Sequence, residues 1–250
     1  MSLFLPSHTP SGRMVYILGA LCTLFFILSV QAAELDQQET RIKLSTGLLY
    51  SNGQGTTFDN PNVSTTSLPL LINLKQGRFS LGLSTAYQSL SSDTFSAEGL
   101  GDTTLSVGYD LLENPWLTLN IKQKFATGDS KKGLSTGKND TSLQLDYFYP
   151  LQPNTALFAH IGHKFVGKVR GAAMQDTRYA SLGTAYTYMN SANIGLSLDY
   201  RESIFKRLED QAGLSVFLSQ PLNKIYSYSL FAGYDSTHTL NSGITLSTQF

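Results

Sequence analysis

The stretch that decides the fold spans residues 99–129, GLGDTTLSVGYDLLENPWLTLNIKQKFATGD, in which two alternating runs flank the breaker Asn114-Pro115. Apolar residues occupy every second position from Leu105 to Leu111 and again from Leu117 to Ile121. A period of two is the side-chain period of a β-strand. The stretch therefore predicts an antiparallel hairpin with one apolar and one polar face.

The length of these strands bears on what their apolar face contacts. Each run extends for about ten residues, whereas strands of soluble sheets mostly have about five or six. A tilted strand needs roughly ten residues to cross the hydrocarbon core of a membrane. A soluble β-sandwich would show the same alternation, but the strand length favours a barrel whose apolar face contacts lipid.

Two short segments of this stretch resemble those of a known family. They are Gly99 to Asp102 (GLGD) and Lys124 to Asp129 (KFATGD), and residues 133–141 then lead into the next strand. They resemble the GLGD and PTGD segments of the outer-membrane "transporter" family of the phenol-degradation MetA-pathway type, with Ala126 where that family commonly has proline. The resemblance covers roughly residues 99–167. It implies a bacterial outer-membrane barrel with a transport role.

The composition is also typical of a barrel. Only 14% of the 250 residues are charged, 11% are aromatic, and the formal net charge is zero. No cluster of Lys or Arg interrupts this pattern, so we expect no nucleic-acid partner. No long segment with a helical period follows residue 35. The chain therefore reads as an all-β membrane protein rather than a soluble enzyme.

Residues 1–32 predict a secretory signal peptide, because an apolar run from Val15 to Val30 follows a basic residue and precedes small residues at the cleavage position. The run is short for a spanning helix, which disfavours a retained anchor. The only cysteine, Cys22, lies in this segment, so the mature chain is expected to have no disulfide. Residues 33–39 predict a short periplasmic lead, and residues 40–250 predict the barrel.

The alternating runs of residues 40–250 predict a single 12-stranded antiparallel transmembrane β-barrel, with short periplasmic turns and longer extracellular loops. Every unpaired backbone group in hydrocarbon costs several kcal/mol, so the first strand is expected to pair with the last. Pro69 lacks an N–H group and predicts a bulge or weakened pairing in the second strand. The terminal Phe250 resembles the C-terminal signal that the outer-membrane barrel-assembly machinery reads.

Aromatic residues gather at both ends of the predicted apolar face, as in barrels with an aromatic girdle at each lipid–water interface. The girdle next to the long loops is expected to contain Tyr50, Tyr87, Phe125, Phe165, Tyr200 and Tyr234. The girdle next to the short turns is expected to contain Phe79, Tyr109, Trp116, Tyr147, Tyr186, Tyr226 and Phe250.

The polar face collects ionisable residues that would otherwise contact lipid. Such a mixed lining is either a polar path or a set of salt-bridged side chains that fills the barrel. Twelve strands lie between the filled eight-stranded and the open sixteen-stranded barrels, so the sequence leaves both possibilities open. The residues expected to line the lumen are Lys43, Asp110, Lys122, Lys124, Asp146, His160, Lys164, Asp199, Arg201 and Asp235.

Neither metal nor cofactor chemistry is expected. His160 and His163 differ in parity on one strand, so they point to opposite faces and cannot bind one metal ion. No serine motif accompanies either histidine, so an outer-membrane hydrolase is the less favoured alternative. Asp129 and Asp140 could bind a cation in their loop, but a solvated loop is the better interpretation.

Together these patterns predict a porin-like channel in a Gram-negative outer membrane. It would allow passive diffusion of small, aromatic or otherwise hydrophobic molecules, with the loop from Gly128 to Asn139 as a candidate lid. The expected partners are outer-membrane lipid and lipopolysaccharide, the barrel-assembly machinery and a small-molecule solute. The alternative is a non-conducting structural or assembly barrel.

Overall fold

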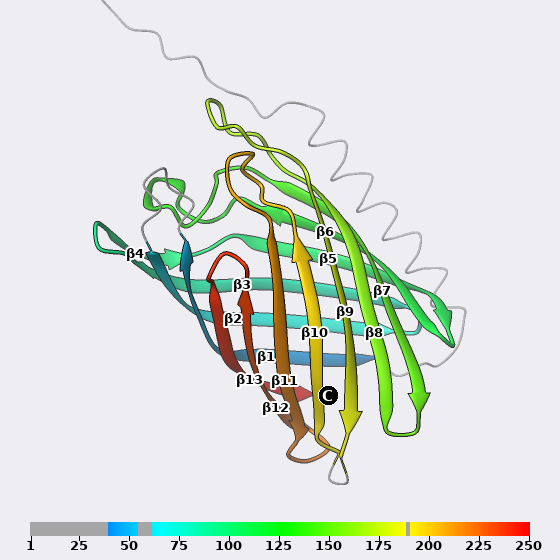
Figure 1. The fold of residues 1–250 in the computed structure, drawn as a ribbon. Helices are drawn as coiled ribbons and strands as arrows, with labels where there is room; N and C mark the ends of the chain where they lie inside the picture. The colour runs from blue at the N-terminus through cyan, green and yellow to red at the C-terminus, as the bar shows by residue number, and fades with distance from the viewer. Residues whose placement is uncertain (1–39, 55–61, 189–190) are drawn as a thin grey trace, which may run out of the picture. The chain divides into compact units, whose positions relative to one another are not determined.

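The computed structural model describes residues 40–54, 62–188 and 191–250, which form one antiparallel sheet that closes into a barrel (Figure 1). The predicted signal peptide, 1–32, and periplasmic lead, 33–39, lie outside the described residues. The strands are β1 (Arg41–Gln54), β2 (Asn62–Gln76), β3 (Phe79–Ser91), β4 (Ser96–Leu100), β5 (Thr103–Glu113), β6 (Trp116–Phe125), β7 (Asp140–Gln152), β8 (Thr155–Phe165), β9 (Thr177–Thr187), β10 (Asn193–Arg201), β11 (Gln211–Pro221), β12 (Tyr226–Asp235) and β13 (Leu240–Gln249).

Two of these segments form a single strand of the barrel. Both β4 and β5 pair antiparallel with β3. The ladder is interrupted at Gly101 and Asp102, although the Gly101 N–H still donates to the Ala86 carbonyl at 2.8 Å. The thirteen labelled segments therefore make the 12-stranded barrel that the sequence predicted.

The barrel closes between its first and last strands. β1 pairs with β13 from Lys43 opposite Gln249 to Asn52 opposite Leu240. Two further backbone hydrogen bonds, of 3.0 and 2.8 Å, join Ile42 to the terminal Phe250. This pairing gives partners to backbone groups that no water could satisfy within a membrane.

Pro69 weakens one ladder without shifting it. β1 and β2 pair at Thr46–Leu70 and at Leu49–Ser67 in the same register, but not between these two pairs. The Thr46 hydroxyl donates to the Pro69 carbonyl at 2.8 Å. The predicted weakened pairing is confirmed, and the bulge is not formed, because proline removes a donor without adding a residue.

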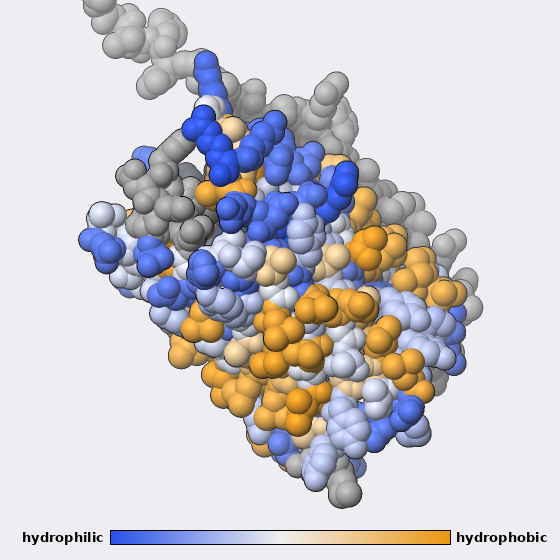
Figure 2. Space-filling view, in the orientation of Figure 1, coloured by the Kyte–Doolittle hydropathy of each residue, from blue (hydrophilic) through white to orange (hydrophobic). Residues whose placement is uncertain are grey.

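The strands bury no hydrophobic core. The buried hydrophobic residues of the described chain all lie in loops or turns: Leu134, Val166, Met174 and Ala192. On the outward face, in contrast, Leu198 is 63% exposed and Ile161 is 62% exposed. Figure 2 shows hydrophobic side chains spread over the strands and hydrophilic ones gathered toward the long loops. A soluble sandwich would bury these residues, so the apolar face requires lipid.

The two rims of the barrel differ as predicted, with short turns at one end and longer loops at the other. Two of the long loops support each other, since Met174 forms an isolated bridge with Phe205 and the Gln175 N–H donates to the Ile204 carbonyl at 2.9 Å. Among the described residues, no helix is long and apolar enough to cross a membrane.

One predicted girdle residue lies on the other face. Trp116 is opposite Phe148 in the ladder, and their rings are 5.8 Å apart. Trp116 shares the parity of the polar residues Thr118 and Asn120 on β6, and Phe148 shares that of Asp146 on β7, so both belong to the inward face. The prediction was wrong because it considered only the position of Trp116 at a strand end, and not its parity.

Candidate functional site

The register aligns inward-facing residues of neighbouring strands into rows across the wall of the lumen. One row, which we call the acidic row, contains the carboxylates of β5, β7, β10 and β12 with a histidine among them. It consists of Asp110, Asp146, His160, Asp199 and Asp235, linked through Thr118, Ser181 and Gly213. The sequence predicted that these residues share a face, and the register shows that they also lie on one continuous row, which climbs from Asp110 near a short turn to Asp235 at the rim of the longer loops.

Most carboxylates of the acidic row are held by neutral donors. Asp146 accepts hydrogen bonds from the side-chain amides of Asn120 and Gln144, both at 2.6 Å. Asp199 accepts from Ser215 at 2.7 Å, and Asp235 accepts from Thr237 at 2.6 Å. Only Asp110 has an ion-pair partner within the described residues, namely Lys75 at 2.5 Å.

The basic residues lie toward the long loops, one or two rows above the acidic row. Lys122 and Lys164 are both opposite Ser142 and form the basic row. Lys122 donates to the Gln144 side-chain oxygen at 2.9 Å, and Arg201 donates to Gln211 at 2.9 Å. Lys164 makes no hydrogen bond or ion pair with any described residue.

Aromatic rings lie against the inner wall rather than across the lumen. A Cβ added at Gly162 would be 2.3 Å from the Tyr179 ring, and one added at Gly195 would be 2.2 Å from the Phe217 ring. The Tyr179 hydroxyl then reaches Gln144 at 2.9 Å. Each glycine therefore supplies a recess that an aromatic ring covers, which keeps large side chains flat against the sheet.

Two adjoining cavities occupy the space inside this wall. Their volumes are about 400 and 510 Å³, and both are lined by Tyr179, Arg201, Gln211 and Asn241. The ion pairs of the inward face, Lys75–Asp110 and those of Lys124, lie outside this shared lining. The space between these lining residues is therefore not filled by ion-paired side chains.

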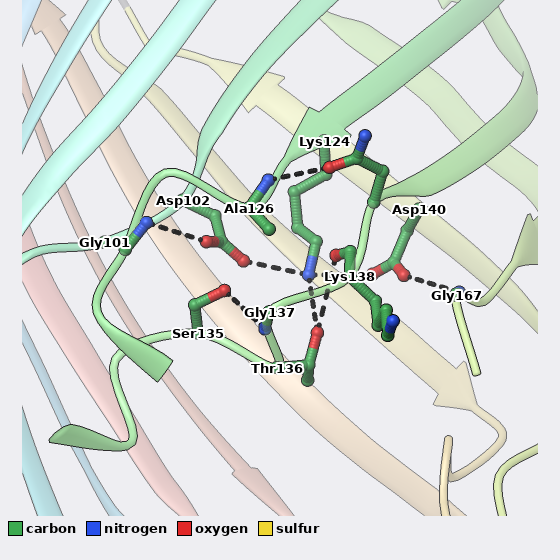
Figure 3. A network of polar contacts seen from close by, with 12 residues as sticks. Gly101, Asp102, Lys124, Ala126, Ser135, Thr136, Gly137, Lys138, Asp140 and Gly167 are labelled. Carbon is green, nitrogen blue, oxygen red and sulfur yellow. Dashed lines mark hydrogen bonds and ion pairs between the residues drawn. The ribbon is translucent and has the colours of Figure 1, made fainter. Parts of the chain in front are cut away.

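A lysine network fixes the long loop between β6 and β7. The Lys124 ammonium lies 2.9 Å from Asp102 and 3.0 Å from Asp140, and Figure 3 shows it directed also at Thr136 of the loop. The Asp102 carboxylate accepts from the Gly128 N–H at 3.2 Å. The loop thereby docks on the interruption between β4 and β5.

The two segments that carry the family resemblance meet in this network. Asp102 comes from GLGD, and Lys124 and Gly128 come from KFATGD. The Thr127 hydroxyl also donates to the Gly101 carbonyl at 3.1 Å. Segments more than twenty residues apart therefore form one polar site at the rim.

Other predicted residues are placed as follows. The histidines occupy opposite faces, since His160 lies in the acidic row and the His163 ring contacts Phe165 at 4.6 Å. Asp129 caps the short 3-10 helix η1 (Ser130–Lys132), whereas Asp140 binds Lys124, so the two carboxylates do not converge. No group of three or more metal-ligating side chains occurs among the described residues. Lys43 faces Gln249 near the periplasmic end.

Several residues of the lumen were not predicted from the sequence. Asp102 was noticed only as part of a motif, and Lys75 was not singled out. The inward parity of Tyr179 and Phe217 could have revealed them, because aromatic residues on a polar face are unusual. Parity alone does not show that each ring lies over a glycine of the neighbouring strand, because this arrangement depends on the register.

Comparison with known proteins supports the fold. No family model matches this chain, and no curated protein matches it in sequence. The COG4313 outer membrane channel from Pseudomonas putida F1 is 15% identical, with a TM-score of 0.61 over 86% of this chain and 97% of that one. The KdgM porin in complex with oligogalacturonate is 12% identical, with a TM-score of 0.57 over 83% of this chain and 99% of that one.

A third solved structure is the translocator domain of the autotransporter NalP from Neisseria meningitidis, which is 11% identical, with a TM-score of 0.54 over 94% of this chain and 97% of that one. Identities this low show the fold alone. The chain is therefore an outer-membrane β-barrel, and its fold and apolar outer surface place it in the bacterial outer membrane. None of the three names describes an enzyme.

Proposed function

We propose that the protein is a channel for passive diffusion of small molecules across the outer membrane. The observation that carries the proposal is the polar space in the lumen, with cavities of about 400 and 510 Å³ bordered by Tyr179 and Arg201. Carboxylates that accept hydrogen bonds from neutral donors, and the unpaired Lys164, are charged groups that can bind water or a solute. A barrel with a purely structural role has no need of such groups.

The mechanism follows from the rows of charge. On β6, β8 and β10, a solute that enters from the loop end meets Lys122, Lys164 and Arg201 before it reaches the acidic row of those strands and their neighbours. Because these charges of opposite sign lie at separate positions on the wall rather than in pairs, each can favour a different part of a polar solute. The resemblance to the MetA-pathway transporter type suggests small aromatic or otherwise hydrophobic solutes as the cargo.

The loop from Gly128 to Asn139 serves in this proposal as a lid. Its docking depends on Lys124, whose two carboxylate partners are 13% and 10% exposed at their side chains. Loss of these contacts would free the loop from the rim, so the network sets how readily the outer end of the lumen opens.

The experiment is planar-bilayer conductance of the refolded mature protein, with solute flux into liposomes as a second readout. The proposal predicts steady conductance. It also predicts that Lys122→Glu shifts the reversal potential toward cation selectivity, because Lys122 faces the lumen and its ammonium donates only to the neutral Gln144 side chain. Absence of both conductance and flux would remove the channel and leave a structural or assembly barrel.

Two further parts of the proposal concern maturation. Removal of the predicted signal peptide, residues 1–32, would precede assembly by the barrel-assembly machinery, with Phe250 as its recognition residue. The apolar face would then contact lipid and lipopolysaccharide. N-terminal sequencing of the outer-membrane form tests the cleavage: a chain that begins near residue 33 supports it, and one that retains Val15 to Val30 contradicts it.

A hydrolase has little support from the lumen. Within the described residues, no hydrogen bond joins His160 to a serine or to a carboxylate, and its ring neighbour is Tyr179 at 5.9 Å. Activation of a serine needs a base within hydrogen-bond reach.

A further inference from the structure

We propose that the larger luminal cavity is a binding site for a small organic anion with an apolar body, such as an aromatic carboxylate. The inference rests on the proposed channel function for its route of access and names the class of solute. It is carried by an unpaired ammonium, a second cation and an apolar wall that line the same space of about 510 Å³. This volume is in the usual range for small-molecule sites.

The basic side of the cavity consists of Lys164 and Arg201. Lys164 is only half-buried, has no hydrogen-bond or ion-pair partner within the described residues and is repelled by other cations, namely Lys122, Lys124 and Arg201. Arg201 directs its Nε and one terminal nitrogen to a single acceptor, the Gln211 side-chain oxygen. Its remaining N–H groups are free to bind a carboxylate.

The acidic groups around this cavity are engaged by other partners or lie at exposed loop positions. Asp140, which attracts Lys164, is already ion-paired with Lys124 at 3.0 Å. Glu202 accepts the Arg178 N–H at 2.7 Å. Glu209 lines the cavity from an exposed loop position. A bound carboxylate would therefore add to the attraction that Asp140 exerts on Lys164 and would offset the repulsion between Lys164 and Arg201.

The other side of the cavity is apolar and favours a hydrophobic body. It is lined by Val63 and Leu90 from the strands and by Phe95, Ile204, Phe205 and Leu208 from the loops. A simple inorganic anion would leave these groups in contact with water, whereas a neutral hydrocarbon would leave the two cations unpaired. The two sides together favour a solute that carries both a negative charge and an apolar body.

The experiment is an equilibrium titration of the refolded barrel in detergent micelles, followed by ligand NMR, with benzoate, acetate and benzyl alcohol as probes. We expect benzoate to bind at least tenfold more tightly than acetate, which lacks the body, or benzyl alcohol, which lacks the charge. We expect Lys164→Gln and Arg201→Gln each to weaken benzoate binding by about tenfold. Lys168→Gln is the matched control, because this lysine pairs with Asp176 outside the cavity.

Three outcomes would overturn the inference: benzoate binding that is absent, that is unchanged in both variants, or that is no tighter than acetate binding. Retention of the folded, heat-resistant form on gels shows that each variant is intact. Because binding is measured without transport, the site and the channel are separable. Benzoate binding without conductance or benzoate flux into liposomes would contradict the channel but support the site, and steady conductance without benzoate binding would do the reverse.

Discussion

The two walls of the lumen differ sharply. The wall formed by β6, β7, β8 and β10, which we call the charged wall, carries acidic and basic residues at several levels. The wall formed by β13, β1, β2 and β3, the neutral wall, has its charged inward residues only near the periplasmic end, at Arg41, Lys43 and Lys75. Otherwise it presents small residues such as Ser45 and Gly47 and, beside the larger cavity, the apolar Val63 and Leu90. The charged groups of the path are therefore concentrated on one wall, and the other wall closes the barrel and adds apolar surface.

The largest expected effect concerns closure of the neutral wall. A Cβ at Gly47 would be 2.1 Å from the Ile244 carbonyl oxygen on β13. Because backbone cannot move aside, we expect Gly47→Ala to separate β1 from β13 and to destabilise the barrel by more than about 3 kcal/mol. Urea unfolding in lipid vesicles measures this loss.

The matched substitution on the charged wall is Gly162→Ala, where the obstacle is the Tyr179 side chain at 2.3 Å. A side chain can rotate, so we expect a loss of about 1 kcal/mol, together with a lower conductance because the ring is pushed into the lumen. Equal losses of stability in the two variants would contradict the proposed division between the walls.

An effect somewhat smaller than that of Gly47→Ala is expected at the loop network. Lys124→Met leaves Asp102 and Asp140 near each other without a cation, which costs about 3 kcal/mol for a largely buried pair. We expect faster proteolysis of the loop from Gly128 to Asn139 and a larger fraction of open time in bilayer recordings. A lid that opens no more often in this variant would show that Lys124 has a structural role only.

Selectivity should depend on which wall carries the charge. Lys122→Glu on the charged wall is expected to change the anion-to-cation permeability ratio several-fold. Lys43→Glu makes the same change of charge on the neutral wall, near the periplasmic end, and is expected to have a weaker effect because counterions screen a charge beyond about 10 Å. Reversal potentials under a salt gradient measure both, and equal shifts would argue against a path along the charged wall.

The smallest effect is a pH dependence of the long loop between β8 and β9. The Lys168 ammonium, at 2.6 Å, and the Val166 N–H, at 3.0 Å, hold the pKa of the Asp176 carboxyl below its usual value. A lowered pKa means that this contact stabilises the loop above the usual carboxyl pKa and is lost as the pH falls through the lowered value. Amide exchange at Val166 should therefore rise only in acid, and Asp176→Asn should remove this dependence.

The sequence predicted the barrel well because each strand obeys a local rule. Alternation fixed the strands and their faces, and the lengths of the connections distinguished the two rims. Trp116 was assigned to the wrong face because its position at a strand end was given more weight than its parity. The interruption at Gly101 and Asp102 was not expected, because it depends on how the loop docks there through Lys124.

The site was only partly predictable, for a physical reason. Parity shows that Asp146, His160 and Asp199 face inward, but only the register of several strands places them in one row. The unpaired state of Lys164 also follows from what its neighbours bind, which is a property of the assembled wall. Composition alone could not distinguish this lumen from one filled by ion pairs.

The central claim is that one face of each strand contacts water and the other contacts lipid, and substituted cysteines test it most directly. The chain has a single cysteine, Cys22, within the predicted signal peptide. In the mature protein in liposomes, a membrane-impermeant thiol reagent is predicted to label Ser215→Cys and Thr245→Cys, on inward faces, but not Val216→Cys or Leu246→Cys, on outward faces. Labelling of the outward pair would contradict contact of that face with lipid, and protection of the inward pair would contradict contact of the other face with water.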